Sequence, residues 1–234
     1  MQKVRKLTGT RTVGRVQSDD RGLVSSATNP LGKSGSVRKL VLRRSKQDVP
    51  VPALLCSPVT SGKKPRPAVI YVASMGKTSG FGENDAIAKA IASGKIVLAI
   101  DVRGFGETAG SGGGSYGGMP RESYHAAMLS LHLNRPLLGQ RTEDILTAVS
   151  YLASREDVDE SRIELIGVGH CGPVALHAAA FDKRISQVTV VQSIPAWLAV
   201  LGTPTAGSQL ENVVPFALET YDLPDLVRAI APRK

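Results

Sequence analysis

The sequence has little of what marks several large classes of protein. Only two of its 234 residues are cysteine, Cys56 and Cys171, and they lie 115 positions apart, a separation that matches neither a disulfide framework nor a zinc site. No stretch approaches the roughly 20 consecutive apolar residues that cross a bilayer, and the first residues lack the apolar core of a secretory signal. We therefore expect a soluble cytoplasmic protein with no bound metal and no membrane partner.

Aromatic side chains are also scarce, at 4% of the chain, so few of them are available to stack on nucleic-acid bases. The net charge of +9 comes from one end, because residues 1–44 hold eleven of the 29 Lys and Arg but only two of the 20 Asp and Glu. The rest of the chain is neutral overall and has no basic stripe of the kind that neutralises phosphates. We expect no nucleic-acid partner, and we interpret residues 1–36, which have no apolar period, as a basic and poorly ordered N-terminal arm.

Regular apolar patterns begin at residue 37, and with 42% apolar residues the chain is expected to fold around a core. Residues 37–43 alternate between apolar and polar positions, and residues 49–58 contain prolines typical of an edge strand, so the two segments predict a hairpin. Short apolar runs and helical patterns then alternate. The further strands are expected at residues 68–74, 95–101, 162–167 and 187–193, and the helices at residues 83–94, 121–133, 140–154, 173–181 and 223–230.

Strands that alternate with helices over short links form parallel pairs with right-handed crossovers. The sequence therefore predicts one α/β domain over residues 37–234, with a mostly parallel sheet of about six strands and helices on both faces. Ligands of such sheets bind beyond the carboxyl ends of the strands. Candidate site residues are thus expected in the turns after residues 68–74, 95–101 and 162–167.

Three segments carry motifs of a known group of enzymes. Residues 101–108, DVRGFGET, follow a predicted strand and resemble the D-x-R-G-x-G-x-S/T stretch of α/β-hydrolases. Residues 141–167 resemble the helix and strand that deliver the nucleophile in hydrolases of the acetyl xylan esterase, dienelactone hydrolase and prolyl oligopeptidase group. Residues 217–233 are similar to the segment before the seventh strand of the acetyl xylan esterase-like members. The resemblance spans about residues 37–233. It implies an α/β-hydrolase fold and an enzyme that hydrolyses small acyl esters, such as acetyl esters, without a cofactor.

In that family the nucleophile, usually the Ser of G-x-S-x-G, lies on a strained turn between a strand and a helix, where N–H groups bind the oxyanion and the substrate. The equivalent residues 167–173 read GVGHCGP, and the count from the start of the strand puts Gly169, which has no nucleophilic group, at this turn. A register two residues later makes Cys171 the nucleophile, as in dienelactone hydrolases, with a pKa lowered by the helix N-terminus. The second register expects a small residue at the position of Pro173, which argues against it. In the first register Cys171 is an inert thiol. His170 lies in the turn itself and offers a backbone or imidazole donor to an oxyanion.

In the family the acid follows strand seven and the histidine follows strand eight, whereas this sequence stops at Lys234, where strand seven would begin. The resemblance thus implies a shortened fold without strands seven and eight and without the usual acid and base. Met75 and Gly76 follow a predicted strand, in the loop that donates an oxyanion N–H in hydrolases. We expect weak ester hydrolysis, either through Cys171 or by attack of water on an ester held near Met75 and His170.

Two other interpretations remain open. A glycine at the turn and a missing acid and histidine are also expected of a catalytically inactive binding module or of a truncated chain. In such a chain residues 187–193 would form an exposed edge strand, and we expect a homodimer that pairs through this edge. Residues 167–172, GVGHCG, match the G-x-G-x-x-G fingerprint of dinucleotide-binding proteins, but Gln192 and Ser193 stand where the ribose-binding acid is expected, which argues against that site. The remaining histidines are expected to be structural, with the last of them in the core: His125, His132 and His177.

Overall fold

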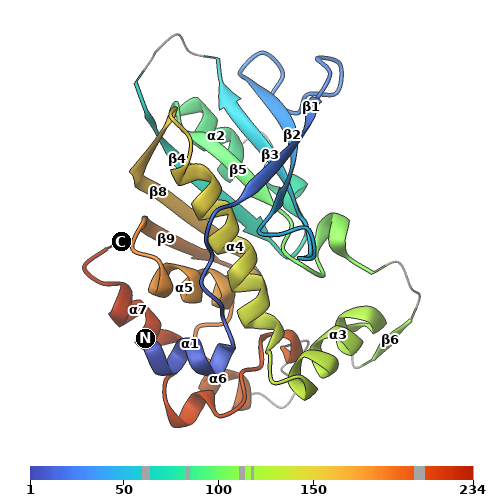
Figure 1. Ribbon diagram of the computed structural model, residues 1–234, viewed down its shortest axis with the longest axis vertical. Helices are drawn as coiled ribbons and strands as arrows, with labels where there is room; N and C mark the ends of the chain where they lie inside the picture. Colours follow the sequence, from blue (N-terminus) through green and yellow to red (C-terminus); the bar gives the residue numbers. More distant parts are fainter. Residues whose placement is uncertain (60–63, 83–84, 111–113, 117–118, 203–208, 234) are drawn as a thin grey trace.

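The computed structural model describes residues 1–59, 64–82, 85–110, 114–116, 119–202 and 209–233, and its centre is a seven-stranded sheet in the order β1-β2-β3-β5-β4-β8-β9 (Figure 1). Strands β1, β2 and β3 run antiparallel and join β5, whereas β5, β4, β8 and β9 are parallel to one another. The strands of the sheet are β1 (Gln17–Leu23), β2 (Gly35–Arg43), β3 (Val51–Pro58), β4 (Arg66–Ala73), β5 (Ile96–Ile100), β8 (Val158–Val168) and β9 (Ile185–Val191), and a separate small pair is formed by β6 (Ser115–Tyr116) and β7 (Met119–Pro120).

Helices cover both faces of this sheet, as the alternating sequence pattern predicted. The helices are α1 (Gln2–Thr8), α2 (Ala86–Ala92), α3 (Arg121–His132), α4 (Leu137–Ala153), α5 (Cys171–Phe181), α6 (Trp197–Leu201) and α7 (Leu223–Ile230), with short 3₁₀ helices η1 (Lys77–Gly80), η2 (Gly106–Thr108), η3 (Leu210–Asn212) and η4 (Ala217–Glu219). Figure 1 shows α4 and α5 lying together against one face, and α2 packs on β3, β4 and β5. Among the described residues, no helix is long and apolar enough to cross a membrane.

The two faces of the central strands have separate apolar clusters because successive side chains of a strand point in opposite directions. Ile70 belongs to the cluster beneath α4 and α5, whereas its neighbour Val69 belongs to the cluster that contains Ile87 of α2. Strands buried on both faces are typical of parallel sheets in α/β proteins, and they explain why β4 and β5 read as continuous apolar runs. The predicted class, an α/β fold with a mostly parallel sheet, is confirmed, with one strand more than the six expected.

The additional strand lies in the N-terminal segment, where the sequence predicted only an irregular arm. Strand β1 pairs with β2, from Gln17 opposite Arg43 onwards, and helix α1 packs on α4 with Val4 buried. The prediction of a loop was wrong for these two elements because neither shows a usable apolar period. Helix α1 is only seven residues long, and the side chains of β1 are mostly exposed, so backbone pairing alone identifies it as a strand.

Strand β9 lies at one edge of the sheet, next to β8. The carboxyl ends of the parallel strands β4, β5, β8 and β9 meet at one end of the sheet, so the turns that follow them are neighbours in space. The motif-bearing segments of the sequence therefore come together there.

Candidate functional site

The turn between β8 and α5 has the strained strand-to-helix geometry that the sequence predicted for the candidate catalytic turn. Strand β8 ends at Val168, helix α5 begins at Cys171, and between them Gly169 takes a φ of +64°, a conformation that other residues adopt only with strain. The Gly169 N–H donates to Val191 O at 2.9 Å, and its carbonyl accepts from Gly172 N at 3.1 Å, so both sides of the turn are held. This geometry favours the register in which Gly169, and not Cys171, stands at the corner.

Cys171 is the first residue of α5, and its side chain is completely buried. Burial raises the pKa of this thiol to about 12, which outweighs the favourable positive charge of Arg141 nearby. The lowered pKa expected from the helix N-terminus is therefore not found. A thiol with such a pKa carries almost no thiolate at neutral pH, which fits the interpretation of Cys171 as an inert core residue.

His170, in the turn itself, is paired with an acid that the sequence had not suggested. Its Nδ1 lies 3.1 Å from Oε1 of Glu211, and the other carboxylate oxygen of Glu211 accepts from Nη2 of Arg141 at 2.5 Å. Glu211 is buried, which by itself would raise its pKa, but the hydrogen bond with His170 and the charge of Arg141 lower the pKa below its usual value. The His170 side chain is 30% exposed, so this acid–histidine pair is open to a ligand. Neither a motif nor a fixed spacing connects residues 41 positions apart, so the sequence could not have revealed it.

Ser74 lies directly beside the turn. It follows β4, and its N–H donates to Val168 O at 3.3 Å. A Cβ atom placed on Gly169 would lie 2.5 Å from the Ser74 Oγ, closer than any real Cβ contact. The hydroxyl of Ser74 therefore occupies the space that a side chain at position 169 would need.

The loop that carries Met75 and Gly76 is fixed by the first residue of the DVRGFGET motif. Asp101 is buried and accepts from the Lys77 N–H at 2.7 Å, from Lys77 Nζ at 2.5 Å and from the Glu107 N–H at 2.9 Å. The Gly76 N–H donates to Ala73 O at 3.0 Å, so it holds the loop and is not free for an oxyanion. In the described part of the chain, the N–H groups of Met75 and His170 have no hydrogen-bond acceptor, and these two remain as candidate oxyanion donors.

Helix α4 connects this loop system to the acid–histidine pair. Asp144 accepts from Arg103 Nε at 2.9 Å and from its Nη2 at 2.5 Å. Arg141, which is fully buried, donates from Nε to Arg103 O at 2.9 Å and lies over the Phe105 ring at 4.0 Å, while its Nη2 reaches Glu211. The segments that resemble α/β-hydrolases thus act together as a framework that holds Glu211 in place.

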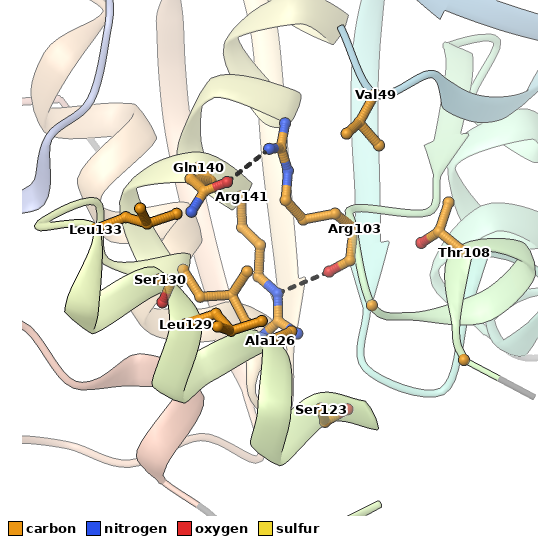
Figure 2. A pocket seen from close by; sticks show the side chains of 13 residues that line it. Val49, Arg103, Thr108, Ser123, Ala126, Leu129, Ser130, Leu133, Gln140 and Arg141 are labelled. Atoms are coloured by element: carbon orange, nitrogen blue, oxygen red, sulfur yellow. Dashed lines mark hydrogen bonds between the residues drawn. The ribbon is translucent and has the colours of Figure 1, made fainter. Parts of the chain in front are cut away.

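A pocket of about 400 Å³ adjoins this framework between α3, α4 and the loop after β5 (Figure 2). Figure 2 shows Arg103 bonded to Gln140 on one side and Arg141 reaching toward α3 on the other, with Leu129 and Leu133 as apolar walls. The Arg141 Nη1 atom is buried and has no hydrogen-bond partner among the residues that the structure describes. No group of three or more His, Cys, Asp or Glu that could hold a metal ion lies within the described ranges.

Comparisons with known proteins identify a family and a fold for this chain. Residues 39–196 match the family described as Acetyl xylan esterase (AXE1). A Bacillus subtilis protein named "Putative hydrolase YtaP" is 27% identical over 173 residues, which are 73% of this chain and 53% of that protein, so the chain spans about half the length of the curated relative that it matches.

Solved structures share the fold. A "putative acetyl xylan esterase" of Bacteroides fragilis superimposes with a TM-score of 0.75 at 14% identity over 99% of this chain and 64% of its own. The acetyl xylan esterase of Paenibacillus sp. R4 superimposes with a TM-score of 0.60 at 22% identity over 98% and 70%, respectively. Because the family match covers more than half of the sequence, the chain belongs to the acetyl xylan esterase family of α/β-hydrolases.

Proposed function

We propose that this protein hydrolyses carboxylic esters of small acyl groups, with acetyl esters as the first candidates. The observation that carries the proposal is the pair of His170 and buried Glu211 at the strand-to-helix turn, 3.1 Å apart. Family membership and the similarity to solved structures described as acetyl xylan esterases support the same chemistry. In this proposal, Glu211 and His170 take the roles of the acid and the base.

His170 is the proposed general base. A carboxylate only accepts hydrogen bonds, so Nδ1 carries the proton toward Glu211 and Nε2 is left to take a proton from the attacking group. The lowered pKa of Glu211 keeps it ionised, which orients the ring and stabilises the imidazolium that forms during the reaction. Arg141 holds Glu211 from the other side and so acts as a positioning residue.

The developing oxyanion is proposed to bind the N–H groups of Met75 and His170. Removal of one such donor typically lowers kcat by about 10²- to 10³-fold. Gly76 and Gly169 contribute by shaping the loop and the turn, since their own N–H groups donate to Ala73 O and Val191 O. As a nucleophile, Cys171 is a weaker candidate than water, because burial keeps its thiol protonated.

The test is hydrolysis of a short-chain nitrophenyl ester. Replacement His170→Ala is expected to lower kcat/KM by about 10²- to 10⁴-fold, because a general base contributes about that much. His132→Ala, at an exposed position of α3, is the matched control and should leave the rate unchanged, as should Cys171→Ala. Full activity in the His170 variant contradicts the proposed base, and loss of activity in the Cys171 variant supports the thiol route instead.

A non-catalytic binding module is the second candidate, favoured by the absence of a nucleophilic side chain at Gly169. A binding module would give no hydrolysis with any ester. It would still be stabilised against thermal unfolding by acetylated sugars, by roughly 2.7 kcal/mol at 100 times the dissociation constant.

We also propose a homodimer through the edge strand β9. Its outer backbone groups face no further strand within the described residues, and such edges pair readily with another chain. Thr189→Lys, at an exposed position of β9, is expected to convert a dimer into a monomer in light scattering, because charged edge residues oppose pairing. A wild-type monomer at all concentrations contradicts this proposal.

A further inference from the structure

We propose that Ser74 supplies the nucleophile that the turn itself lacks. The inference rests on the proposed ester hydrolysis and assigns its first chemical step to a residue from a different strand. Its starting point is the lack of space beside Gly169: a Cβ atom on Gly169 would lie 2.5 Å from the Ser74 Oγ and 3.7 Å from its Cβ. A serine hydroxyl thus lies beside the β8–α5 turn, although the residue in the turn itself, Gly169, has no side chain.

The pairing of the strands explains how this happens. β4 and β8 are parallel neighbours, and Ala73 lies opposite Val168 in their register. Ser74 and Gly169 are therefore the next residues beyond the pair, at the carboxyl ends where ligands of such sheets bind. Neighbouring strands are about 4.8 Å apart, a span that one side chain can bridge. Ser74 thus reaches the place that a serine at position 169 would have filled.

The Ser74 hydroxyl has no structural task within the described residues. It is half-buried, and none of the hydrogen bonds among those residues involves its Oγ. Ser79, five positions later, is different: its Oγ donates to Gly76 O at 2.8 Å and lies 3.1 Å from the Tyr71 hydroxyl. A buried or half-buried hydroxyl normally finds a partner, so the free Oγ of Ser74 beside the turn is available to a substrate.

The groups that this chemistry requires lie on the residues that follow Ser74 and Gly169 in the chain. The Met75 N–H, a candidate oxyanion donor, belongs to the next residue of the chain. His170 follows Gly169 directly, and its Nε2 forms no hydrogen bond among the described residues, while its Nδ1 is bound to Glu211. Hydrogen bonds between nucleophile and base are often long without substrate and shorten in the complex, so the residues can act together when an ester is bound.

The reaction then proceeds in two balanced steps. The Ser74 Oγ bonds to the acyl carbon as its proton passes to His170, and collapse of the oxyanion breaks the bond to the alcohol, which leaves with the proton from His170. Water next attacks the acyl-Ser74 ester, loses a proton to His170 and releases the acid, while the Ser74 oxygen takes that proton back. Water is the only co-reactant, and no oxidation occurs.

A fluorophosphonate probe tests the assignment because it reacts with activated serines without any need for turnover. Mass spectrometry of the labelled protein is expected to place the adduct on the peptide that contains Ser74. Ser74→Ala should abolish labelling and lower nitrophenyl acetate hydrolysis by at least about 10³-fold, as loss of a nucleophile does. Ser193→Ala is the matched control, since this serine lies on the other side of the turn beside Gly172, and it should keep both properties.

A side-chain exchange makes the test independent of simple loss of activity. Ser74→Gly combined with Gly169→Ser removes the crowding hydroxyl and returns one to the corner, so it is expected to recover at least ten times the activity of Ser74→Gly alone. Gly169→Ser by itself introduces the 2.5 Å contact and should be less stable than the double variant in thermal unfolding.

The outcomes separate this inference from the proposed function. Hydrolysis that survives Ser74→Ala, with labelling elsewhere or absent, overturns the assignment and leaves the esterase in place. Labelling at Ser74 without turnover of any ester supports the assignment and overturns the esterase. Absence of both contradicts both.

Discussion

The protein places ion pairs in two contrasting regions. On the antiparallel β1–β2 pair, Arg38 and Asp20 lie 2.5 Å apart with side chains 41% and 48% exposed. At the carboxyl ends of the parallel strands, Lys77 and Asp101 lie equally close but only 4% and 1% exposed. Water and salt screen the first pair, whereas the second is shielded from both.

The difference shows where in the fold the protein uses buried charge. A buried ion pair is a poor source of net stability, yet removal of one partner is costly because the other is left uncompensated. Asp101 holds the loop after β4, and the buried pair of Arg141 and Glu211 holds His170. These buried pairs therefore fix the geometry around the β8–α5 turn, whereas the exposed pair lies on β1 and β2, toward the other edge of the sheet.

The largest loss of stability is expected for Lys77→Met, which removes one partner of the buried pair. This change leaves the Asp101 carboxylate buried without its cation, and we expect a loss of about 3–5 kcal/mol in the free energy of unfolding measured with urea. Lys95→Met is the matched control, because Lys95 pairs with Glu164 at 2.7 Å while their side chains stay 28% and 25% exposed. The control should lose about 1 kcal/mol or less. Equal losses in the two variants would show that burial does not distinguish the pairs.

The next effect concerns His177, which is fully buried on α5 as its apolar surroundings in the sequence predicted. Its Nδ1 donates to Pro173 O at 2.6 Å, its Nε2 accepts from the Tyr221 hydroxyl at 2.7 Å, and burial lowers its pKa to about 4. The unfolded chain takes up this proton first, near the ordinary pKa of about 6.5. The contribution of neutral His177 to stability is thus present above about pH 6.5 and is lost as the pH falls toward 4, by up to about 3 kcal/mol.

Urea unfolding at a series of pH values measures this dependence. The double variant His177→Leu with Tyr221→Phe replaces the bonded pair by apolar side chains, so its stability should fall less steeply between pH 6.5 and pH 4 than that of the wild type. Parallel curves for the two proteins would contradict a role for His177 in acid sensitivity.

The fold could be predicted from the sequence wherever burial leaves a periodic trace. β4 and β5 are buried on both faces and read as apolar runs, and α4 shows a helical pattern, so these elements were identified close to their observed bounds. Strand β1 was missed because its side chains are largely exposed and its pairing with β2 uses the backbone. Patterns of side chains cannot report an element that is held by main-chain hydrogen bonds.

The candidate site divides in the same way. Gly169 and His170 could be located because they follow a clear strand and precede a clear helix. Glu211 could not be, since it meets the turn through a long-range contact with no fixed spacing in the chain. Ser74 ends a predicted strand, but its contact with Gly169 could not be predicted for the same reason. The lowered pKa of Cys171, which only the later register implied, is not found for a related reason: position at a helix N-terminus is visible in a sequence, whereas complete burial is a property of the packed core.

The smallest effect is expected on the exposed side of the contrast, for Arg38→Gln. The pKa of Asp20 is lowered chiefly by the N–H of Gly22, which donates to its carboxylate at 2.8 Å, and only secondarily by Arg38. The carboxylate therefore keeps its main partner when Arg38 is replaced, and water solvates the rest. We expect the urea midpoint of unfolding to be unchanged within error, both at 10 mM salt and at 1 M, where screening would remove any remaining attraction. A loss at low salt that disappears at high salt would show instead that the exposed pair does stabilise the β1–β2 region, and the contrast between the two regions would then be one of degree.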